Sequence, residues 1–369
     1  MLEYRPFDGS LEEFSQFVIA TWESTYLGKM PVPQWSAEYF DWQLRLSEPE
    51  NRNHLFAAYD GTQIAGALAM FPATFELHGK RISGAQGSWL SISNDYRGQG
   101  IAKDLHIASR KQLQQEERDV MLGFKYFGSR RSLGINFWKK MQQQKNTMPA
   151  GEIGFWARVI DPRRAAKWNL NFWESKLTAL ATPVTFAPKV ATLPNFSIRP
   201  VTSTDLPACA ALAQSASTKC DLRLVWSEAE LEHQFGLKSS QADGPVDCTS
   251  VKHLASGLVA EKDGKVCGCI SYHVLPIRGQ CVEPVGIIDL VFVDQLTRRE
   301  QVALVNAALE QMQKAGAILA LKTRTHDYPK GLFLRWGWVG KPAETQILLS
   351  WVDQSQEFSP VKSHQVLWR

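Results

Sequence analysis

Arg97, Gly98 and Gly100 are the residues whose types and spacing most clearly favour chemistry, within the stretch RGQGIA at 97–102. Glycine costs roughly 1 kcal/mol in a helix interior and packs nothing in a strand. A helix that opens on glycines leaves its first amide groups uncovered at the positive end of its dipole, and Arg97 adds a cation beside them. The pattern favours a pyrophosphate site; the alternative is a glycine turn that only joins a strand to a helix.

The composition argues against several other classes of function. The 369 residues carry a net charge of +4, without a lysine- or arginine-rich block that would follow a nucleic-acid backbone. The sequence has no signal-like start and no run of about twenty apolar residues. No His and Cys pairs have zinc spacing. We therefore expect a soluble, cytoplasmic protein that binds no metal and has neither nucleic acid nor membrane as a partner.

The two halves of the chain nearly repeat each other. EYRPFDG (3–9) is echoed by SIRPVTS (197–203), and LFAAYDGTQIAGA (55–67) is echoed by LVAEKDGKVCGCI (258–270). The echoes come in the same order. Because solenoid repeats are much shorter than this period of roughly 200 residues, the pattern indicates a duplicated domain.

A proline-containing stretch of low charge at 181–195 is typical of a linker between the two copies. We expect each copy to form its own sheet. The predicted boundaries are a first domain at 1–160, a linker at 161–195 and a second domain at 196–369.

The first copy has the element pattern of an α+β domain with a mixed α/β sheet. Apolar periodicity predicts a short strand and helix, a three-stranded meander, a long helix from Ile101, then a strand, a helix and a last strand. The meander and the elements after the long helix are expected at 54–59, 64–72, 82–93, 118–127, 132–141 and 152–160.

The stretch RGQGIA, preceded by the strand WLSIS (89–93), resembles the pyrophosphate loop of the GCN5-related N-acetyltransferase (GNAT) superfamily. That loop has Arg or Gln, two residues, Gly, one residue, and then Gly or Ala. The order of elements agrees with the family over residues 1–160. The resemblance implies two tandem GNAT-like acyl-CoA N-acyltransferase domains, with a CoA site in the first.

The resemblance also implies how CoA is held. Backbone amides from Gly98 to Ala102 would bind the pyrophosphate, and the strand edge around Leu90 and Ile92 would pair with the pantetheine arm. The cofactor-binding residues that follow from it are Leu90, Ile92, Arg97, Gly98, Gln99, Gly100, Ile101, Ala102 and Arg131.

The second copy departs from the family pattern at the corresponding loop. Between the strand IIDLVFV (287–293) and the next helix there is no glycine. Thr297 and Glu300 instead have the spacing of a capping box, in which the two side chains occupy the amides that a phosphate would take. We therefore predict that the second copy is degenerate, binds no CoA, and shapes or covers the site of the first.

The sequence does not decide which residues act as the catalytic acid and base. GNAT proteins usually supply an acid tyrosine from the helix after the fifth strand; Trp138 stands there, and indole is no acid near neutral pH. Arg131 replaces the usual asparagine, and either reaches a CoA phosphate or is a solvated helix charge. Tyr126 either supplies a hydroxyl where the central strands splay or is a half-buried strand aromatic. The thiolate could also leave unaided, given a thiol pKa of about 8.5. Glu76 and His78 are candidate bases, or else a solvated hairpin tip.

The acceptor segment of the family corresponds to the aromatic stretch at 21–44, which either lines a pocket for a small polar molecule or packs helices around Trp35 and Trp42. We predict an N-acyltransferase that uses acetyl-CoA, or another acyl-CoA, as co-substrate and a small-molecule amine as acceptor. One alternative is a non-catalytic acyl-CoA-binding or sensing protein. Another is an aminoacyl-tRNA-dependent peptidyltransferase, against which the intact CoA loop stands.

Overall fold

The computed structural model describes most of the chain and divides it into two compact units. The described residues are 2–46, 48–126, 135–143, 147–171, 175–176, 188–217, 219–237, 255–335, 337–353 and 359–367. Unit 1 consists of Met1–Ile153, Asp221–Leu224 and Ala343–Arg369, and unit 2 of Gly154–Cys220 and Val225–Pro342.

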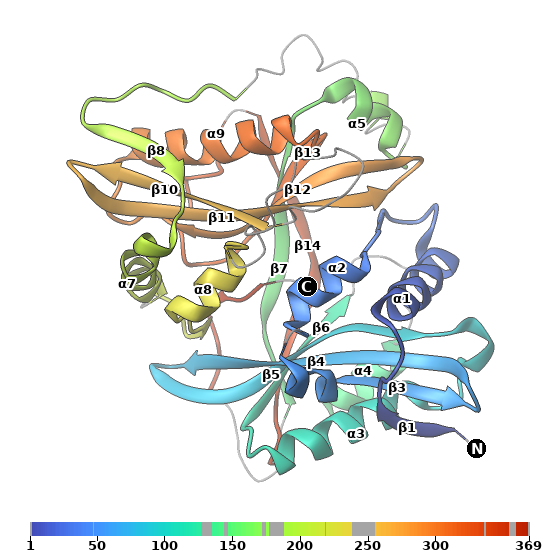
Figure 1. Ribbon diagram of the computed structural model, residues 1–369. Coiled ribbons are helices and arrows are strands. Elements are labelled where there is room, and N and C mark those ends of the chain that lie inside the picture. Colours follow the sequence, from blue (N-terminus) through green and yellow to red (C-terminus); the bar gives the residue numbers. More distant parts are fainter. Residues whose placement is uncertain are drawn as a thin grey trace. The chain divides into compact units, whose positions relative to one another are not determined.

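Unit 1 is a sheet with the strand order β1-β3-β4-β5-β6-β14, and with β9 beside β4. Helices α1 and α2 cover one face of this sheet, and α3 and α4 cover the other (Figure 1). The elements that lie wholly in unit 1 are β1 (Glu3–Pro6), α1 (Leu11–Tyr26), β2 (Val32–Pro33), α2 (Ala37–Leu44), η1 (Pro49–His54), β3 (Leu55–Asp60), β4 (Gln63–Leu77), β5 (Lys80–Ile92), η2 (Asn94–Tyr96), α3 (Ile101–Gln115), β6 (Val120–Tyr126), α4 (Ile135–Gln142), β9 (Leu222–Leu224) and β15 (His364–Gln365).

The local sequence explains why these elements begin and end where they do. Ser10 caps α1 by accepting a hydrogen bond from the amide of Glu13 at 3.1 Å. Gly61 (φ +60°) and Gly79 (φ +80°) make the two turns of the β3–β4–β5 meander. The meander, the long helix and the strand and helix after it were all predicted from the sequence, and the structure confirms them.

The two central strands of unit 1 pair only briefly. β5 and β6 are parallel, with a register from Gly84↔Val120 to Gln86↔Leu122. Beyond that point β5 continues to Ile92 and β6 to Tyr126, and no described residue pairs with either strand on the facing edge. We call this opening, at β5 residues 87–92 and β6 residues 123–126, the unit 1 splay.

Unit 2 has the corresponding strand order, β7-β13-β12-β11-β10-β8. Helices α5 and α9 lie on one face of its sheet and α7 and α8 on the other (Figure 1). The elements wholly in unit 2 are α5 (Pro162–Trp168), β8 (Phe196–Pro200), η3 (Ser203–Asp205), α7 (Leu206–Ser217), α8 (Glu228–Gln234), β10 (Ala255–Lys262), β11 (Lys265–Arg278), β12 (Val282–Phe292), α9 (Arg298–Lys314) and β13 (Leu319–Thr323).

The two units repeat each other in detail as well as in element order. The β3–β4 ladder has a bulge after Ala58, which pairs with Gly66, and the β10–β11 ladder has the same bulge after Ala260, which pairs with Gly268. A Cβ at Gly66 would lie 2.9 Å from a side-chain atom of Ile101, and one at Gly268 would lie 2.5 Å from a side-chain atom of Leu296. Each glycine makes room for a residue at the start of the long helix, Ile101, or just before it, Leu296.

The last strand of each copy is exchanged between the units. β7 (Thr147–Val159) begins in unit 1 and pairs with β13 in unit 2, whereas β14 (Trp338–Trp351) begins in unit 2 and pairs with β6 in unit 1. The two strands are also neighbours in the hydrogen-bonded order, so the expectation of two separate sheets is wrong. The copies offer equivalent edges to a last strand, and chain order alone does not say which edge it takes.

The structure also differs from the predicted linker at 161–195, because α5 lies inside that range. Asp161 caps this helix by accepting hydrogen bonds from the amides of Arg163 and Arg164, both at 3.1 Å. Within the described ranges, the helices are too short or too polar to cross a lipid bilayer.

Candidate functional site

The loop at 97–100 and the start of α3 present a row of uncovered amides. Gly98 and Gly100 have φ values of +83° and +87°, and the loop is exposed. The helix ladder begins only with the amide of Lys103, which donates to the carbonyl of Gly100 at 2.9 Å. Among the residues that the structure describes, the five amides of 98–102 have no protein acceptor. They lie at the positive end of a helix of 15 residues, which suits an anion.

Glycine is required in this loop first of all by backbone geometry. Gly98 and Gly100 have positive φ values. Residues other than glycine and asparagine adopt such values only at a cost in conformational free energy. A Cβ at either residue would meet no atom within 4 Å. Among the described residues, nothing therefore fills the space beside the Cα atoms of these two glycines.

Arg97 lies at the edge of this loop and reaches toward the last turn of α1. Its Nη2 donates to the hydroxyl of Thr25, which itself donates to the carbonyl of Thr21 at 2.7 Å. No carboxylate of the described chain pairs with Arg97. The guanidinium is anchored on one side and keeps its positive charge available beside the uncovered amides.

The strand segment around Leu90 and Ile92 is interrupted by a shift in the β4–β5 register. Ile92 pairs with Gly66 of β4, but Trp89 and Leu90 have no partner there because the β4–β5 register shifts between Ala67 and Ala69. Trp89 has a positive φ of +53°. The other edge of this segment faces the unit 1 splay, where no strand of the described ranges pairs with it. An extended ligand with amides could add to that edge as a further strand would.

The aromatic residues of the 21–44 segment pack around Trp89. The Trp89 ring lies 6.4 Å from that of Trp35 and 5.1 Å from that of Phe40. Trp35 and Tyr39 are almost fully buried. Of the two interpretations of this segment, helix packing therefore describes Trp35, and an aromatic pocket for an acceptor is not formed by it.

A tyrosine and a carboxylate meet at the end of β6, the strand that borders the unit 1 splay. The hydroxyl of Tyr126, the last residue of β6, donates to Oε2 of Glu344 at 2.6 Å, and both side chains are half-buried. Burial, followed by the hydrogen bond and charge of Glu344, raises the pKa of Tyr126 above its usual value. Tyr26 of α1 adds to this shift, so it lies near the pair. Glu344 gave no signal in the sequence, because its strand comes from the other end of the chain.

Alternation along β6 shows which face of the sheet this pair occupies. A Cβ at Gly123 would lie 3.6 Å from the Trp138 ring, so α4 covers the Gly123 face. Successive strand residues point to opposite faces, so Tyr126 points away from α4, toward the face covered by α1. Trp138, which holds the family's usual tyrosine position, and Tyr126 are therefore on opposite sides of β6.

The other predicted catalytic and binding residues are elsewhere. Glu76 accepts a hydrogen bond from Nη2 of buried Arg223 at 2.6 Å, and Nδ1 of His78 lies 3.8 Å from Asp221. Glu76 pairs with Arg81, nine residues before Leu90 on β5, or roughly 30 Å along a strand. Glu76 and His78 therefore lie at the far end of the hairpin from Leu90, which agrees with the second interpretation of these residues, a hairpin tip. Arg131 is outside the described residues.

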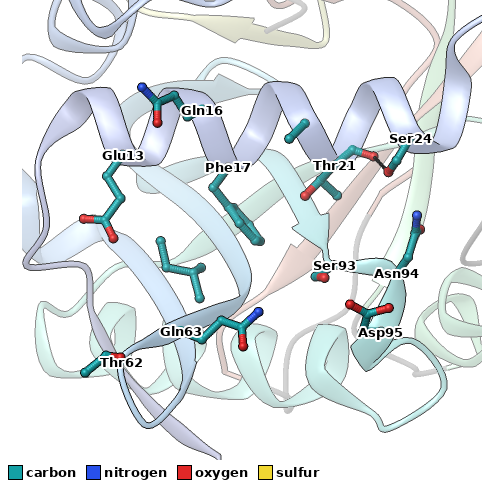
Figure 2. Close-up of a pocket in the computed structure, with 12 residues that line it drawn as sticks. Glu13, Gln16, Phe17, Thr21, Ser24, Thr62, Gln63, Ser93, Asn94 and Asp95 are labelled. Carbon is teal, nitrogen blue, oxygen red and sulfur yellow. Dashed lines mark hydrogen bonds between the residues drawn. The ribbon is translucent and has the colours of Figure 1, made fainter.

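A polar groove with a volume of about 530 Å³ lies beside the loop in unit 1. Side chains of α1, among them Gln16 and Thr21, face the β3–β4 turn and η2 across it (Figure 2). Asn94 and Asp95 of η2 lie three to four residues before the first uncovered amide, that of Gly98. The groove therefore opens next to the loop, on the α1 side.

The corresponding places in unit 2 are filled by the chain itself. Thr297 and Glu300 form the predicted capping box at the start of α9, with the amide of Thr297 donating to Glu300 at 2.7 Å. The parallel β12–β13 register ends at Ile288↔Lys322, and Nζ of fully buried Lys322 donates to the carbonyl of Asp289 at 2.7 Å. A side chain thus occupies the strand edge that is open in unit 1.

Comparisons with known proteins agree with this geometry. Residues 9–127 match a family model described as an acetyltransferase (GNAT) domain. A crystal structure of N-myristoyltransferase from Saccharomyces cerevisiae with bound myristoyl-CoA superimposes with a TM-score of 0.71 at 14% identity, over 95% of this chain and 82% of that one. A GCN5-related N-acetyltransferase from Anabaena variabilis gives a TM-score of 0.53 at 13% identity, over 96% and 73%.

A third solved structure, a GCN5-related N-acetyltransferase from Kribbella flavida, gives a TM-score of 0.53 at 11% identity, over 95% of this chain and 70% of that one. No curated protein matches the sequence. Residues 9–127 of this chain therefore match a GNAT domain, and the chain as a whole shares the fold of these solved structures. The resemblance seen in RGQGIA is confirmed.

Proposed function

We propose that this protein is an acyl-CoA-dependent N-acyltransferase that binds its CoA substrate in unit 1. The observation that carries the proposal is the row of five amides without protein acceptors at residues 98–102, next to the open β5 edge of the unit 1 splay. The amides would hold the pyrophosphate, and the open β5 edge would pair with the amide-bearing pantetheine arm. Arg97 supplies a cation beside the phosphates.

Acetyl-CoA is the first acyl donor to test, and a small-molecule amine is the first acceptor. The GNAT domain match supports acetyl transfer. The N-myristoyltransferase with the same fold holds myristoyl-CoA, so a longer acyl chain belongs in the same experiment. The polar groove of α1 and η2 supports a polar acceptor that enters from the α1 side.

The test is a titration followed by a turnover assay. Isothermal titration of acetyl-CoA and myristoyl-CoA measures binding, and release of free thiol measures transfer to ethanolamine, tyramine, spermidine or glycylglycine. Binding together with acceptor-dependent thiol release supports the proposal. If neither acyl-CoA binds at concentrations up to 1 mM, the proposal is wrong. A Kd of 1 mM corresponds to a binding free energy of roughly −4 kcal/mol.

A non-catalytic acyl-CoA sensor is the second candidate, and one observation favours it. Trp138 stands where related proteins have an acid tyrosine, and its ring covers Gly123 on the α4 side of β6. A sensor would bind acyl-CoA with the same residues but would release no thiol with any of the four acceptors. The turnover assay therefore separates the two functions.

A further inference from the structure

We propose that Glu344, supplied by the exchanged strand β14, is the catalytic base of unit 1 and passes its proton to the departing CoA thiolate through Tyr126. The inference deepens the proposed N-acyltransferase function and depends on it. It assigns the C-terminal half of the chain a direct part in the chemistry of the first domain.

The location of Glu344 is the first support for this role. β14 pairs with β6 in an antiparallel ladder that runs from Thr345↔Tyr126 to Trp351↔Val120. Glu344 directly precedes this ladder, so it lies beside the end of β6, the strand that forms one side of the mouth of the unit 1 splay, on the edge of β6 away from β5. An acyl chain held between β5 and β6 would present its thioester at that mouth.

The contacts of Glu344 are the second support. Its Oε2 accepts a hydrogen bond of 2.6 Å from Tyr126, a length typical of a hydroxyl that donates to an ionised carboxylate. Among the described residues, no cation forms an ion pair with Glu344. The half-buried carboxylate therefore keeps accepting capacity for an amine N–H.

The surroundings place this carboxylate on the acceptor side of the sheet. Trp22 of α1 donates its Nε1 hydrogen to Ser91 of β5 at 3.0 Å, and the Trp22 and Tyr26 rings are 5.3 Å apart. The last turn of α1 therefore lies across the splay on the face toward which Tyr126 points. An amine that enters from the α1 side would meet Tyr26, Tyr126 and Glu344 together.

The proton balance is complete with these two residues. A neutral amine attacks the thioester carbonyl, a C–N bond forms, and the nitrogen loses one proton to the Glu344 carboxylate. The C–S bond then breaks, the thiolate takes the hydroxyl proton of Tyr126, and Glu344 returns its proton to Tyr126 across the 2.6 Å bond. The products are the amide and the free thiol, and the enzyme returns to its starting state.

Tyr126 requires Glu344 for this step. Its pKa is raised by burial and by the neighbouring carboxylate, so the phenol alone is a poorer acid than an ordinary tyrosine. Once Glu344 has taken the amine proton, the opposing negative charge is gone and a second proton stands ready. The two residues therefore act as a unit.

The experiment compares Glu344→Gln, Tyr126→Phe and the double variant, with acetyl-CoA and whichever of the four acceptors the parent protein uses best. We expect Glu344→Gln to lower kcat by 10²–10⁴-fold, the usual contribution of a positioned base, while the Kd for acetyl-CoA changes less than twofold. Because the residues act together, the double variant should be no more than a few-fold slower than the slower single variant. Formate should partly restore turnover to Glu344→Ala.

A matched control is available at the far edge of the same sheet. Tyr59 donates to Asp8 at 3.1 Å, a phenol–carboxylate pair of the same kind on β3 and next to β1. Tyr59→Phe should leave both kcat and the Kd for acetyl-CoA within twofold of the parent values.

Two results would overturn the inference: a Glu344→Gln protein whose kcat is within threefold of the parent, or fully multiplicative effects in the double variant together with no rescue by formate. If Glu344→Gln fails to fold, as judged by lost acetyl-CoA binding, Tyr126→Phe alone decides, and an unchanged kcat overturns the relay. Failure of the proposed function is a separate result, because it is read from the parent protein alone.

Discussion

Gly100 shows how one residue can serve both the fold and the ligand. Its φ of +87° requires glycine or asparagine, and its open surroundings leave room for a phosphate. The sequence pointed to Gly100 because a side chain there would block a phosphate. The structure shows that the positive φ also requires glycine or asparagine. A bulky substitution therefore acts on stability and on affinity, and the two effects need separate controls.

We predict that Gly100→Val lowers acetyl-CoA affinity at least tenfold and the free energy of unfolding by about 1–2 kcal/mol. Gly100→Asn should lower the affinity by a similar factor with a smaller loss of stability, because asparagine tolerates positive φ. Titration calorimetry and urea unfolding measure the two effects. Gly61→Val is the control, because Gly61 has a φ of +60° in an open hairpin turn. This variant protein should be less stable than the parent but should bind acetyl-CoA with the same affinity. Unchanged affinity in both Gly100 variants would mean that the loop is only a turn.

Arg97 should contribute less than the amides. Its guanidinium is exposed and screened by solvent, so Arg97→Ala should weaken acetyl-CoA binding by about 1 kcal/mol, or roughly fivefold. The difference between parent and variant should shrink as salt is raised from 50 to 500 mM. Calorimetry at several salt concentrations measures it. A loss that does not depend on salt would indicate that Arg97 acts by holding Thr25 of α1 instead.

At the scale of elements, α3 and α9 occupy equivalent places and differ in their caps. α3 begins with uncovered amides, whereas α9 begins with the Thr297–Glu300 capping box. We predict one acetyl-CoA site per chain in titration calorimetry, because the box and Lys322 fill the second site. Gly100→Val should weaken that single site. A stoichiometry of two would show that the chain's own groups do not exclude the ligand.

The junction of β8 and η3 gives a prediction for pH. The pKa of Asp205 is lowered from 3.8 to about 2, first by Arg199 and then by its hydrogen bonds to Thr202, against the effect of burial. A lowered folded-state pKa adds stability above about pH 4, which is lost as the pH falls toward 2. Asp205→Asn should therefore destabilise the protein by roughly 1–2 kcal/mol at pH 7, and by much less near pH 2.5. Urea unfolding at both values measures this; an equal loss at both would rule out the charge as the cause.

At the scale of the whole molecule, the exchange of β7 and β14 makes each unit depend on the other half of the chain. Without the second half, β6 loses its antiparallel partner β14, and Gln86 loses the carbonyl of Leu367, to which it donates at 2.9 Å. The boundaries expected from the sequence echoes, 1–160 and 196–369, therefore cut through both units.

We predict that a fragment of residues 1–160 does not fold by itself, and that it regains structure when it is co-expressed with residues 161–369. Circular dichroism and thermal unfolding of the purified fragment and complex would show this. The full-length chain should unfold in one transition, because neither unit is complete without a strand from the other half. A fragment 1–160 with a cooperative transition and acetyl-CoA affinity equal to the parent would contradict the prediction.

The sequence by itself determined what depends on neighbours along the chain. The hairpins, the helix cap at Thr297 and the glycine loop at 98–100 all follow from local propensity and backbone geometry, and each was predicted. The duplication was visible for the same reason, because both copies repeat these local signals.

Only the tertiary structure decided which strand completes each sheet and what lies beside Tyr126. Glu344 is 218 residues from Tyr126, and the hydrogen bond between them depends on which of two equivalent edges β14 takes. The role of Glu76 and His78 was left open for the same reason, since a hairpin tip can be placed along the chain but not relative to a splay between other strands. Long-range pairing is decided by the packing of the whole chain, which no local pattern records.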